Sequence, residues 1–416
     1  MCVRGEIEVV SDKSISHRAL ILPALSLEES YIENISPSDD VTRTRNILEA
    51  LGTKIEEKNR GITVRGGNLH EAIFPLYSGN SGTTVRMMMG VVAGLGLFSV
   101  FCGDESLSKR PMRRVTVPLS LMGAKIIGRN NANNLPIAVQ GDSLKGIKYE
   151  LPIASAQVKS SILLAGLNAE GKTEVIEPSP TRDHTERLLK FMGARIKKNG
   201  QTIIIEKSEL SPINLKVPGD FSAAAYFITL ALLHPDAELT IKNVNLNPTR
   251  TGFLKIIEKM GCSVKITRTV DEPEPVGDIH VKTCKDLHGT LIDGALIPLA
   301  IDELPLVAVL GIFAEGETML KDARELRFKE SDRINSIVTE LKKLGADIEE
   351  LPDGFIVRKS TLKNSARLSS HNDHRIAMSL AILSALTEKV VEIEGADWVK
   401  ISFPDFYEKL KEVTGC

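Results

Sequence analysis

Six strongly apolar segments recur along the chain, and each crowds its polar residues into the first turn or two. They are residues 14–26, 81–95, 155–167, 220–233, 302–314 and 373–386. Their length and nearly unbroken apolar character predict buried helices. A helix start presents free N–H groups and the positive end of the helix dipole. If the six starts face one place, they form a site for an anion, which added Lys or Arg would strengthen.

A second pattern recurs about every 70 residues, the period of a supersecondary repeat. LGTKI, MGAKI, MGARI, MGCSV and LGADI each place a glycine between an amphipathic run and a strand-like one, and VTGC closes the chain. The glycines are Gly52, Gly123, Gly193, Gly261, Gly345 and Gly415. We interpret each as the left-handed cap that ends a helix before a strand. The sequence therefore predicts an α/β (α+β) fold of six repeats.

The second, amphipathic helix of several repeats also begins with charge, at SKRPMRR from 108, TRDHTER from 181 and KESDR from 329. Polar residues at a helix start are common caps, and capping alone explains each single case. Lys and Arg, however, oppose the dipole at a helix N-terminus. Their recurrence favours anion binding over capping alone.

Length, composition and net charge indicate which classes of protein the chain can belong to. The 416 residues, 42% hydrophobic and 25% charged, favour two soluble domains over a single core. A net charge of −2 gives no bulk attraction to nucleic acid or to an anionic membrane. No apolar run reaches the roughly 18 residues that a bilayer requires, and the N-terminus lacks a signal peptide. The five scattered cysteines form no CxxC pair, so we expect a protein of the reducing cytoplasm.

Nine motifs follow one another in a characteristic order: DKSISHRA, NSGTTVR, GDESLSKRPM, SAQVKSS, TRDHTE, IDELP, LRFKESDRI, NDHRIAMS and SFPDF. Over nearly the whole chain they resemble the 5-enolpyruvylshikimate-3-phosphate synthase family, in the forms of its class II branch. The resemblance implies two domains of three βαβαββ units each, hinged across a cleft. We expect one domain at 13–220 and the other at 1–12 plus 221–416.

The family reaction joins shikimate 3-phosphate to phosphoenolpyruvate and releases phosphate, in the shikimate pathway of aromatic amino acid biosynthesis. It uses no metal or organic cofactor. Both substrates carry phosphate and one also carries a carboxylate, so the site needs several cations in fixed geometry. We expect shikimate 3-phosphate to neutralise these cations and allow the open domains to close. We also expect a monomer with these two small molecules as its only partners.

The resemblance assigns one set of residues to shikimate 3-phosphate. These are Lys13, Ser14, Arg18, Ser155, Ala156, Gln157, Arg182, Asp302 and Lys329. Ser14 and Arg18 are four positions apart and so share a helix face. Ala156 stands where many relatives have Ser, so only its backbone can bind the ligand.

A second set is assigned to phosphoenolpyruvate: Lys13, Gly82, Thr83, Arg110, Gln157, Arg333 and Arg375. Guanidinium groups fit carboxylate and phosphate with paired hydrogen bonds. Gly82 allows the backbone to approach a ligand, and Asn80 and Arg86 brace its loop. Glyphosate-tolerant relatives often carry Ala at the position of Gly82, so we expect glyphosate to enter here. Ile401 stands where many relatives have a lysine, and the adjacent Lys400 is not assigned as a ligand.

The chemistry requires a base for the 5-hydroxyl and an acid for C3 of the enolpyruvyl group. We expect Asp302 to act as the base, with Lys329 beside it on the hydroxyl. Either Lys13 or Glu330 is the proton donor, and the sequence leaves both open. A carboxylate beside a lysine is also a common structural ion pair.

Three other functions are weighed against this one. The sister enzyme acting on UDP-N-acetylglucosamine usually has a cysteine in the loop that here reads GDESLSKRPM, and an ATP-dependent phosphotransferase would need a GK[ST] loop. A non-enzymatic repeat scaffold would not need an acid–base set. His184, His371 and His374 lie near acids, but they lack the HExxH spacing of a zinc site.

Overall fold

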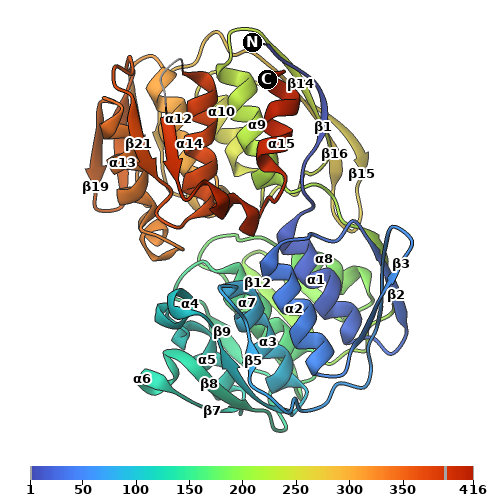
Figure 1. Cartoon of the computed structure of the whole chain (residues 1–416). Helices are drawn as coiled ribbons and strands as arrows, with labels where there is room; N and C mark the ends of the chain where they lie inside the picture. The colour runs from blue at the N-terminus through green and yellow to red at the C-terminus, as the bar shows by residue number, and fades with distance from the viewer. Residues whose placement is uncertain (1, 388–390, 416) are drawn as a thin grey trace. The chain divides into compact units, whose positions relative to one another are not determined.

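The computed structural model describes residues 2–387 and 391–415, and the chain forms two compact units (Figure 1). Unit 1 comprises the described residues of Met1–Val10, Pro218–Asp271 and Pro275–Cys416. Unit 2 comprises Ser11–Val217 and Glu272–Glu274. The boundaries expected at 13 and 220 stay a prediction for the domains as folding units, as does the cleft between them.

Unit 2 holds three repeats, each with a four-stranded sheet. The first contains α1 (Lys13–Ala24), β2 (Glu29–Glu33), α2 (Asp39–Ala50), β3 (Lys54–Lys58) and β4 (Gly61–Arg65), with β13 (Asn214–Lys216) as the parallel partner of β2. The second contains β5 (Leu76–Tyr77), α3 (Gly82–Gly94), β6 (Phe98–Cys102), α4 (Glu105–Lys109), α5 (Arg113–Leu121), β7 (Lys125–Gly128), α6 (Arg129–Ala132) and β8 (Asn134–Gln140). The third contains β9 (Lys148–Glu150), α7 (Ala156–Gly166), β10 (Lys172–Ile176), α8 (His184–Phe191), β11 (Ile196–Asn199) and β12 (Thr202–Glu206).

Unit 1 also holds three repeats. The first contains α9 (Phe221–Leu233), β14 (Ala237–Asn245), α10 (Gly252–Lys259), β15 (Lys265–Val270) and β16 (Val276–Lys282), with β1 (Val3–Glu8) as the parallel partner of β14. The second contains β17 (Leu291–Ile292), α11 (Leu296–Leu299), α12 (Leu304–Phe313), β18 (Glu317–Leu320), η1 (Arg324–Phe328), α13 (Arg333–Lys343), β19 (Ile348–Leu351) and β20 (Gly354–Arg358). The third contains β21 (Ala366–Ser369), α14 (His374–Leu386), β22 (Val391–Glu394), η2 (Ala396–Ile401) and α15 (Phe406–Thr414).

The last repeat departs from the βαβαββ pattern. Among its described residues, β21 and β22 form a two-stranded parallel sheet, and α15 follows without a further hairpin. The other five sheets each have four strands in the same arrangement, with one parallel and two antiparallel neighbour pairs. The fold is therefore the expected two-unit α/β arrangement, with a shortened final repeat.

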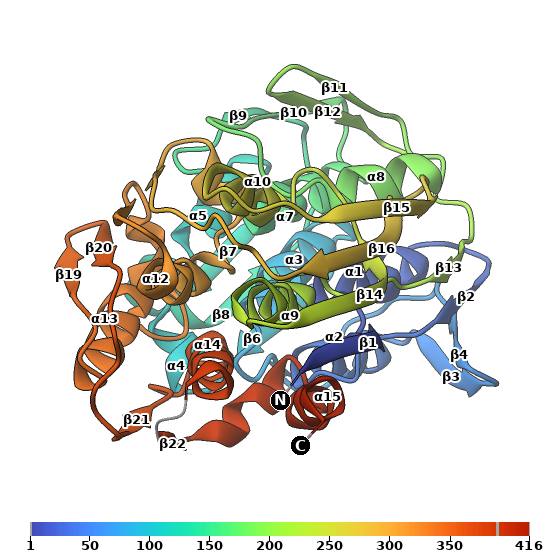
Figure 2. The same ribbon diagram turned by 90° about the horizontal axis from the view of Figure 1, so that it is seen from above.

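The six apolar segments form the six central helices α1, α3, α7, α9, α12 and α14, as the hydrophobic pattern predicts. Most of their residues are buried, because nearly every face of these helices contacts a sheet or another helix. In unit 1, α9 packs along β14 and contacts α12 and α14 (Figure 2). In unit 2, α3 packs closely against α7.

The repeated glycines end helices in the left-handed region, as predicted. Gly52, Gly123, Gly193, Gly261, Gly345 and Gly415 have φ values of 102°, 114°, 88°, 86°, 88° and 66°. An L-residue with a side chain adopts these angles only with strain, so the first five glycines allow the chain to turn from helix to strand, and Gly415 ends α15.

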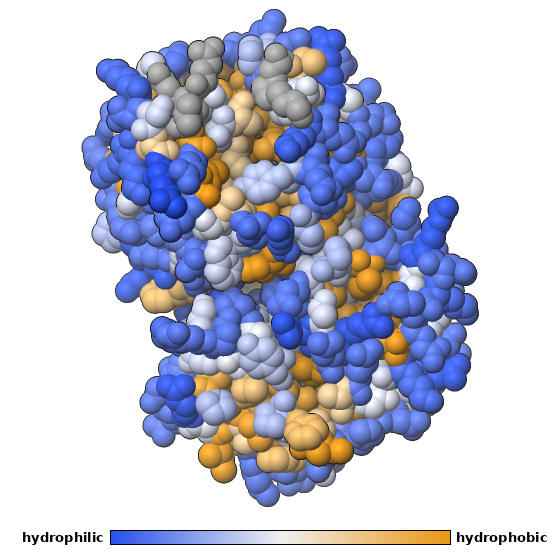
Figure 3. Space-filling view, in the orientation of Figure 1, coloured by the Kyte–Doolittle hydropathy of each residue, from blue (hydrophilic) through white to orange (hydrophobic). Residues whose placement is uncertain are grey.

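The face drawn in Figure 3 is mainly polar. On this face, hydrophilic side chains predominate and apolar ones form small separate groups. In the part of the chain that the structure describes, no helix has the length and apolar character to cross a membrane.

A disulfide joins Cys262, which follows α10, to Cys284, which follows β16. The spacing of the cysteines does not indicate this pair, because the bond depends on how the hairpin β15–β16 folds back. Disulfides are rare in a reducing compartment, so the bond departs from the expectation of reduced cysteines. Cys2 and Cys102 are free.

We predict that Cys284→Ser lowers the free energy of unfolding by about 3 kcal/mol under non-reducing conditions, because the bond closes a loop across a sequence separation of 22 residues. Chemical denaturation of both proteins, with and without dithiothreitol, measures this difference. Equal stability of the two proteins without reductant would contradict the cross-link, and reductant should remove any difference between them.

Candidate active site

The motif DKSISHR opens α1 in unit 2. Asp12 caps the helix, because its side chain accepts a hydrogen bond from the N–H of Ile15 at 2.9 Å. Lys13 is the first helical residue, and its Nζ lies 2.8 Å from Oδ2 of Asp40 at the start of α2. The Ser14 carbonyl accepts a hydrogen bond of 2.7 Å from Arg18. A cation at the start of this helix is thus balanced by a carboxylate of the same unit.

Arg18 is almost completely buried and joins three segments of unit 2. Its Nε donates to Thr185 at 2.6 Å, and its Nη2 donates to Ser160 at 3.0 Å. Burial lowers the pKa of Arg18 to about 10, Glu186 opposes this shift, and the charge of Arg182 adds to it. Arg18 and Arg182 therefore contribute to one local electrostatic environment.

The cation in SAQVKSS lies in the interior of unit 2. Lys159 is fully buried, and its Nζ lies 2.9 Å from Glu177 and 2.7 Å from Glu186. Glu177 also accepts a hydrogen bond of 3.2 Å from the N–H of Thr181, next to Arg182. Lys159 therefore lies within an interior ion-pair group and does not extend the exposed positive charge at the start of α7.

A second group of polar residues surrounds Gly82, the first residue of α3. Arg86 donates to the side-chain carbonyl of Gln157 at 2.6 Å, and Gln157 donates to Thr83 at 3.0 Å. A Cβ atom at Gly82 would lie 2.7 Å from Nη1 of Arg86 and 3.5 Å from Nη1 of Arg110. Gly82 thus presents its backbone directly to two guanidinium groups.

The two residues expected to brace this loop differ in their contacts. Asn80 accepts from Arg110 through Oδ1 at 2.5 Å and donates to Asp104 at 2.7 Å. Arg86 reaches Gln157 of α7 and so links two helices. Ser155 caps α7 by accepting from the N–H of Val158 at 3.4 Å, and Ala156 begins that helix.

Arg333 is the centre of a buried ion-pair group in unit 1. It begins α13 and is 1% exposed. Its Nε donates to Asp373 at 2.8 Å, its Nη2 to Glu330 at 2.6 Å and its Nη1 to Asp302 at 3.2 Å. Burial disfavours its charge, but attraction to these three carboxylates is stronger and raises the pKa of Arg333.

Asp302 lies next to three arginines. Besides Arg333, Nη1 of Arg250 lies 3.7 Å from its Oδ2, and Nη2 of Arg375 lies 3.9 Å from the same atom. Arg375 is almost fully buried in α14; burial opposes its charge, but Asp302 is the strongest of the attractions that raise its pKa. The structure therefore brings together the expected base and two of the cations assigned to phosphoenolpyruvate.

Two more residues adjoin this group. Lys329 follows η1, and removal of its ammonium group from water lowers the pKa of Lys329, although Asp302 attracts the charge. Tyr226 of α9 is buried, and this burial raises the pKa of its hydroxyl to about 12, although the charge of Arg375 favours a lower pKa. Lys329 is thus easier to deprotonate than a surface lysine.

Lys400, His371 and His184 each lie close to one carboxylate. Lys400 lies 2.7 Å from Asp397 of its own 3₁₀ helix, and both side chains are exposed. His371 lies 2.7 Å from Glu340, and His184 lies 2.8 Å from Glu274. Within the described residues, no group of three or more His, Cys, Asp or Glu could hold a metal ion.

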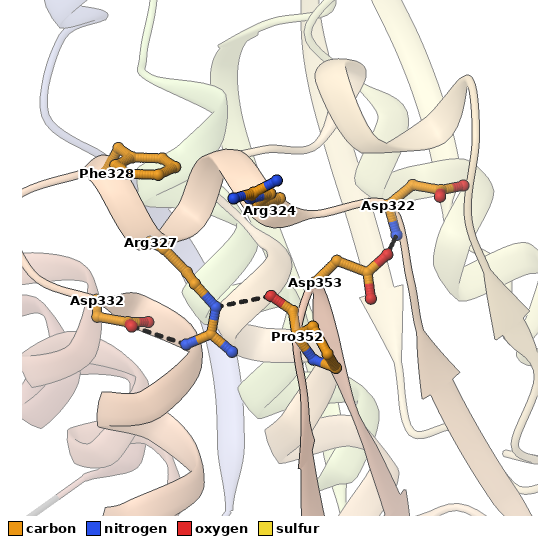
Figure 4. A pocket seen from close by; sticks show the side chains of 7 residues that line it. All are labelled: Asp322, Arg324, Arg327, Phe328, Asp332, Pro352 and Asp353. Carbon is orange, nitrogen blue, oxygen red and sulfur yellow. Dashed lines mark hydrogen bonds and ion pairs between the residues drawn. The ribbon is translucent and has the colours of Figure 1, made fainter. Parts of the chain in front are cut away.

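Unit 1 also has a surface hollow close in sequence to Glu330 (Figure 4). Its lining residues are Asp322, Arg324, Arg327, Phe328, Asp332, Pro352 and Asp353. Arg327 donates to Asp332 at 2.7 Å and to the Pro352 carbonyl at 2.8 Å. None of the residues assigned to the substrates lines this hollow.

Comparison with known proteins identifies the family. The family model for EPSP synthase (3-phosphoshikimate 1-carboxyvinyltransferase) matches residues 2–410. The chain belongs to the EPSP synthase family. Proteins named 3-phosphoshikimate 1-carboxyvinyltransferase from Thermotoga neapolitana and Bacillus subtilis are 48% and 44% identical to it. Each alignment spans 99% of this chain and 97% of the relative.

Solved structures agree with this assignment. EPSP synthase from Acinetobacter baumannii has a TM-score of 0.88 at 39% identity, covering 99% of this chain and 96% of that one. The enolpyruvyl transferase NikO from Streptomyces tendae has a TM-score of 0.78 at 16% identity, covering 99% of this chain and 95% of that one, and this likeness shows the fold alone. The expected family and fold are confirmed.

Several residues of the charged group in unit 1 are not indicated as site residues by the sequence motifs. Arg250, Asp373 and Tyr226 belong to the charged group of unit 1. A signal for Arg250 existed, because NPTR immediately precedes the amphipathic helix α10, as SKRPMRR and TRDHTER precede theirs. Nothing in the local sequence indicates that a tyrosine inside α9 lies near Arg375.

His17, in the same motif as Lys13 and Arg18, gives a pH prediction. It is fully buried, and its Nδ1 lies 2.7 Å from Oγ1 of Thr44. Burial lowers the pKa of His17 to about 3, from an ordinary value of 6.5. The unfolded chain therefore binds a proton as pH falls below about 6.5, whereas the folded protein does not until about 3, so acidification in this window favours unfolding.

We predict that His17 contributes about 2 kcal/mol to the loss of unfolding free energy between pH 7.5 and pH 5. Denaturant titration at both pH values, in the unmodified protein and in His17→Asn, isolates this contribution. Asn is chosen because its amide can replace Nδ1 toward Thr44. If both proteins lose the same free energy over that interval, the neutral state of the buried histidine is wrong.

Proposed function

We propose that this chain transfers the enolpyruvyl group of phosphoenolpyruvate to the 5-hydroxyl of shikimate 3-phosphate and releases phosphate. The observation that carries the proposal is the ion-pair group of unit 1, in which the buried Arg333 contacts both Asp302 and Glu330. The family pattern assigns Asp302 to the reacting 5-hydroxyl and Arg333 to phosphoenolpyruvate. The chemistry makes Asp302 the expected base and Glu330 one of two candidates for the proton donor. Their ion pairs give the fixed geometry that such chemistry requires.

In this proposal, shikimate 3-phosphate is held by Lys13, Ser14, Arg18, Ser155, Ala156, Gln157, Arg182, Asp302 and Lys329. Phosphoenolpyruvate is held by Lys13, Gly82, Thr83, Arg110, Gln157, Arg333 and Arg375. Support comes from the buried Arg18 with Arg182 near it, and from the guanidinium groups around Gly82. Guanidinium groups held by other residues need little reorganisation to bind an anion.

The reaction then follows in two steps. Asp302 accepts the proton of the 5-hydroxyl as its oxygen bonds to C2 of the enolpyruvyl group, while C3 gains a proton. C3 next loses a proton as the C2–O bond to phosphate breaks, and the double bond forms again. Lys13 or Glu330 exchanges the C3 proton; Lys13 is held by Asp40 and Glu330 by Arg333. We further propose a cytoplasmic monomer without nucleic-acid or membrane partners.

We expect phosphate release when the protein is mixed with shikimate 3-phosphate and phosphoenolpyruvate, and none when either substrate is omitted. Arg333→Lys should lower kcat/KM by at least about 100-fold, because an ammonium group cannot reproduce the paired contacts of a guanidinium. Lysine is preferred to alanine, since removal of the charge would leave three carboxylates facing one another. A phosphate-release assay measures both effects.

The matched control is Arg358→Lys, because Arg358 also contacts three carboxylates of unit 1 but lies on the exposed side of β20. It should retain activity within a few-fold. Phosphate release with UDP-N-acetylglucosamine in place of shikimate 3-phosphate would instead support the sister activity. Comparable rates for both lysine variants would contradict the role of Arg333.

Gly82→Ala tests the phosphoenolpyruvate site. The new methyl group would lie 2.7 Å from Arg86, so this guanidinium group must shift and disturb its hydrogen bond to Gln157. We expect the KM for phosphoenolpyruvate to rise by about tenfold and glyphosate inhibition to weaken more, with the KM for shikimate 3-phosphate nearly unchanged. Steady-state kinetics measures all three. Inhibition of the unmodified protein only at millimolar glyphosate would contradict an open site at Gly82.

A further inference from the structure

We propose that Arg250 is a positioning residue that orients the Asp302 carboxylate and keeps it charged. The proposal rests on the function proposed above, in which Asp302 accepts a proton from the substrate. Arg250 is not among the residues that the family pattern assigns to either substrate, and its role here is to act through Asp302.

Arg250 contacts three carboxylates of unit 1. Its side chain is 1% exposed, and its Nη2 donates to Oδ1 of Asp220 at 2.9 Å. Its Nη1 lies 3.5 Å from Glu303 and 3.7 Å from Asp302. One buried guanidinium group thus faces three carboxylates, and Asp302, at 17%, is the most exposed of the three.

The segments that carry these residues fix the geometry. Asp220 caps α9, accepting from the N–H of Ser222 at 2.7 Å and of Ala223 at 3.4 Å. Its own N–H donates to the carbonyl of Val10 at 2.8 Å. Because hydrogen bonds hold both the side chain and the backbone N–H of Asp220, this residue gives Arg250 a rigid anchor, and Arg250 in turn restricts Asp302.

Charged groups from several elements face Asp302 and set its electrostatic environment. The cations are Arg250 before α10, Lys329 after η1, Arg333 of α13 and Arg375 of α14. The carboxylates that share these cations are Asp220 before α9, Glu303 before α12, Glu330 before α13 and Asp373 before α14. Because these cations favour the charged form of Asp302, loss of one of them shifts the balance against a charged Asp302.

The sign of the effect follows directly. A base must be unprotonated to accept a proton, so activity falls on the acidic side as Asp302 becomes protonated. Removing Arg250 disfavours the charged carboxylate, and protonation then occurs at higher pH. Removing Asp220 has the opposite effect, because Arg250 loses a competing carboxylate and its charge acts more strongly on Asp302.

An alternative is that Arg250 only neutralises the buried Asp220 and Glu303. In that case its replacement would lower stability and rate at every pH, without moving the titration of Asp302. Two readouts separate the roles. The first is the pH at which kcat/KM falls on the acidic side. The second is the pH at which the ¹³C signal of the Asp302 carboxyl titrates in protein labelled at aspartate. The signal is assigned by its loss in Asp302→Asn.

The variants are Arg250→Met, Arg250→Lys and Asp220→Asn, with Arg358→Met as a control that loses a cation with three carboxylate partners elsewhere in unit 1. Asn keeps the capping ability of position 220. We expect both readouts to move up by at least about half a pH unit in Arg250→Met and down in Asp220→Asn. Arg250→Lys and Arg358→Met should leave them within about 0.3 unit of the unmodified protein.

If neither the acidic limb of kcat/KM nor the carboxyl titration shifts in Asp220→Asn, the proposal is wrong, even if Arg250→Met does not fold. It is also wrong if Arg250→Met folds and its carboxyl titration does not shift. The carboxyl titration needs no substrate. If the unmodified protein releases no phosphate, the proposed function fails, whereas the titration still decides whether Arg250 holds Asp302 in its charged form.

Discussion

A cation removed from water must be paired with carboxylates, and this constraint determines how the buried polar residues of both units are arranged. A buried guanidinium or ammonium group is stable only when charge and hydrogen bonding are both satisfied. Lys159, Arg250 and Arg333 each have two or three carboxylate partners inside their own unit. The carboxylates in turn fix where each cation points, so that positive charge is held in place before any anion arrives.

The repeat supplies the scaffold for these ion pairs. In the first five repeats, a left-handed glycine ends the amphipathic helix, a strand follows, and the next apolar helix begins from a polar loop. Because the polar residues sit at helix starts, the loops before α9, α10, α12 and α13 bring their charged side chains into one group in unit 1. The residues proposed to bind substrate and the residues that contact them therefore come from the same structural position in successive repeats.

The sequence predicted those features that depend on local pattern. The six central helices and the six glycine caps follow from hydrophobic periodicity and backbone geometry, and the family assignment follows from long motifs. Partners distant in sequence could not be predicted: Asp40 for Lys13, Asp373 for Arg333 and Cys284 for Cys262. Lys159 shows the same limit, because its motif resembles a ligand site while its side chain is occupied by two interior glutamates.

Each unit completes its first sheet with a strand from a remote part of the chain. β1 pairs with β14, and β13 pairs with β2. Deleting the first ten residues would therefore expose the edge of a sheet built mostly from residues beyond 236, and would leave the sheet nearest in sequence intact. For the same reason, a gene split near codon 217 would place β1 on the first fragment, whereas its partner β14 lies on the second. The second fragment could then complete its sheet only by binding β1 of the first fragment.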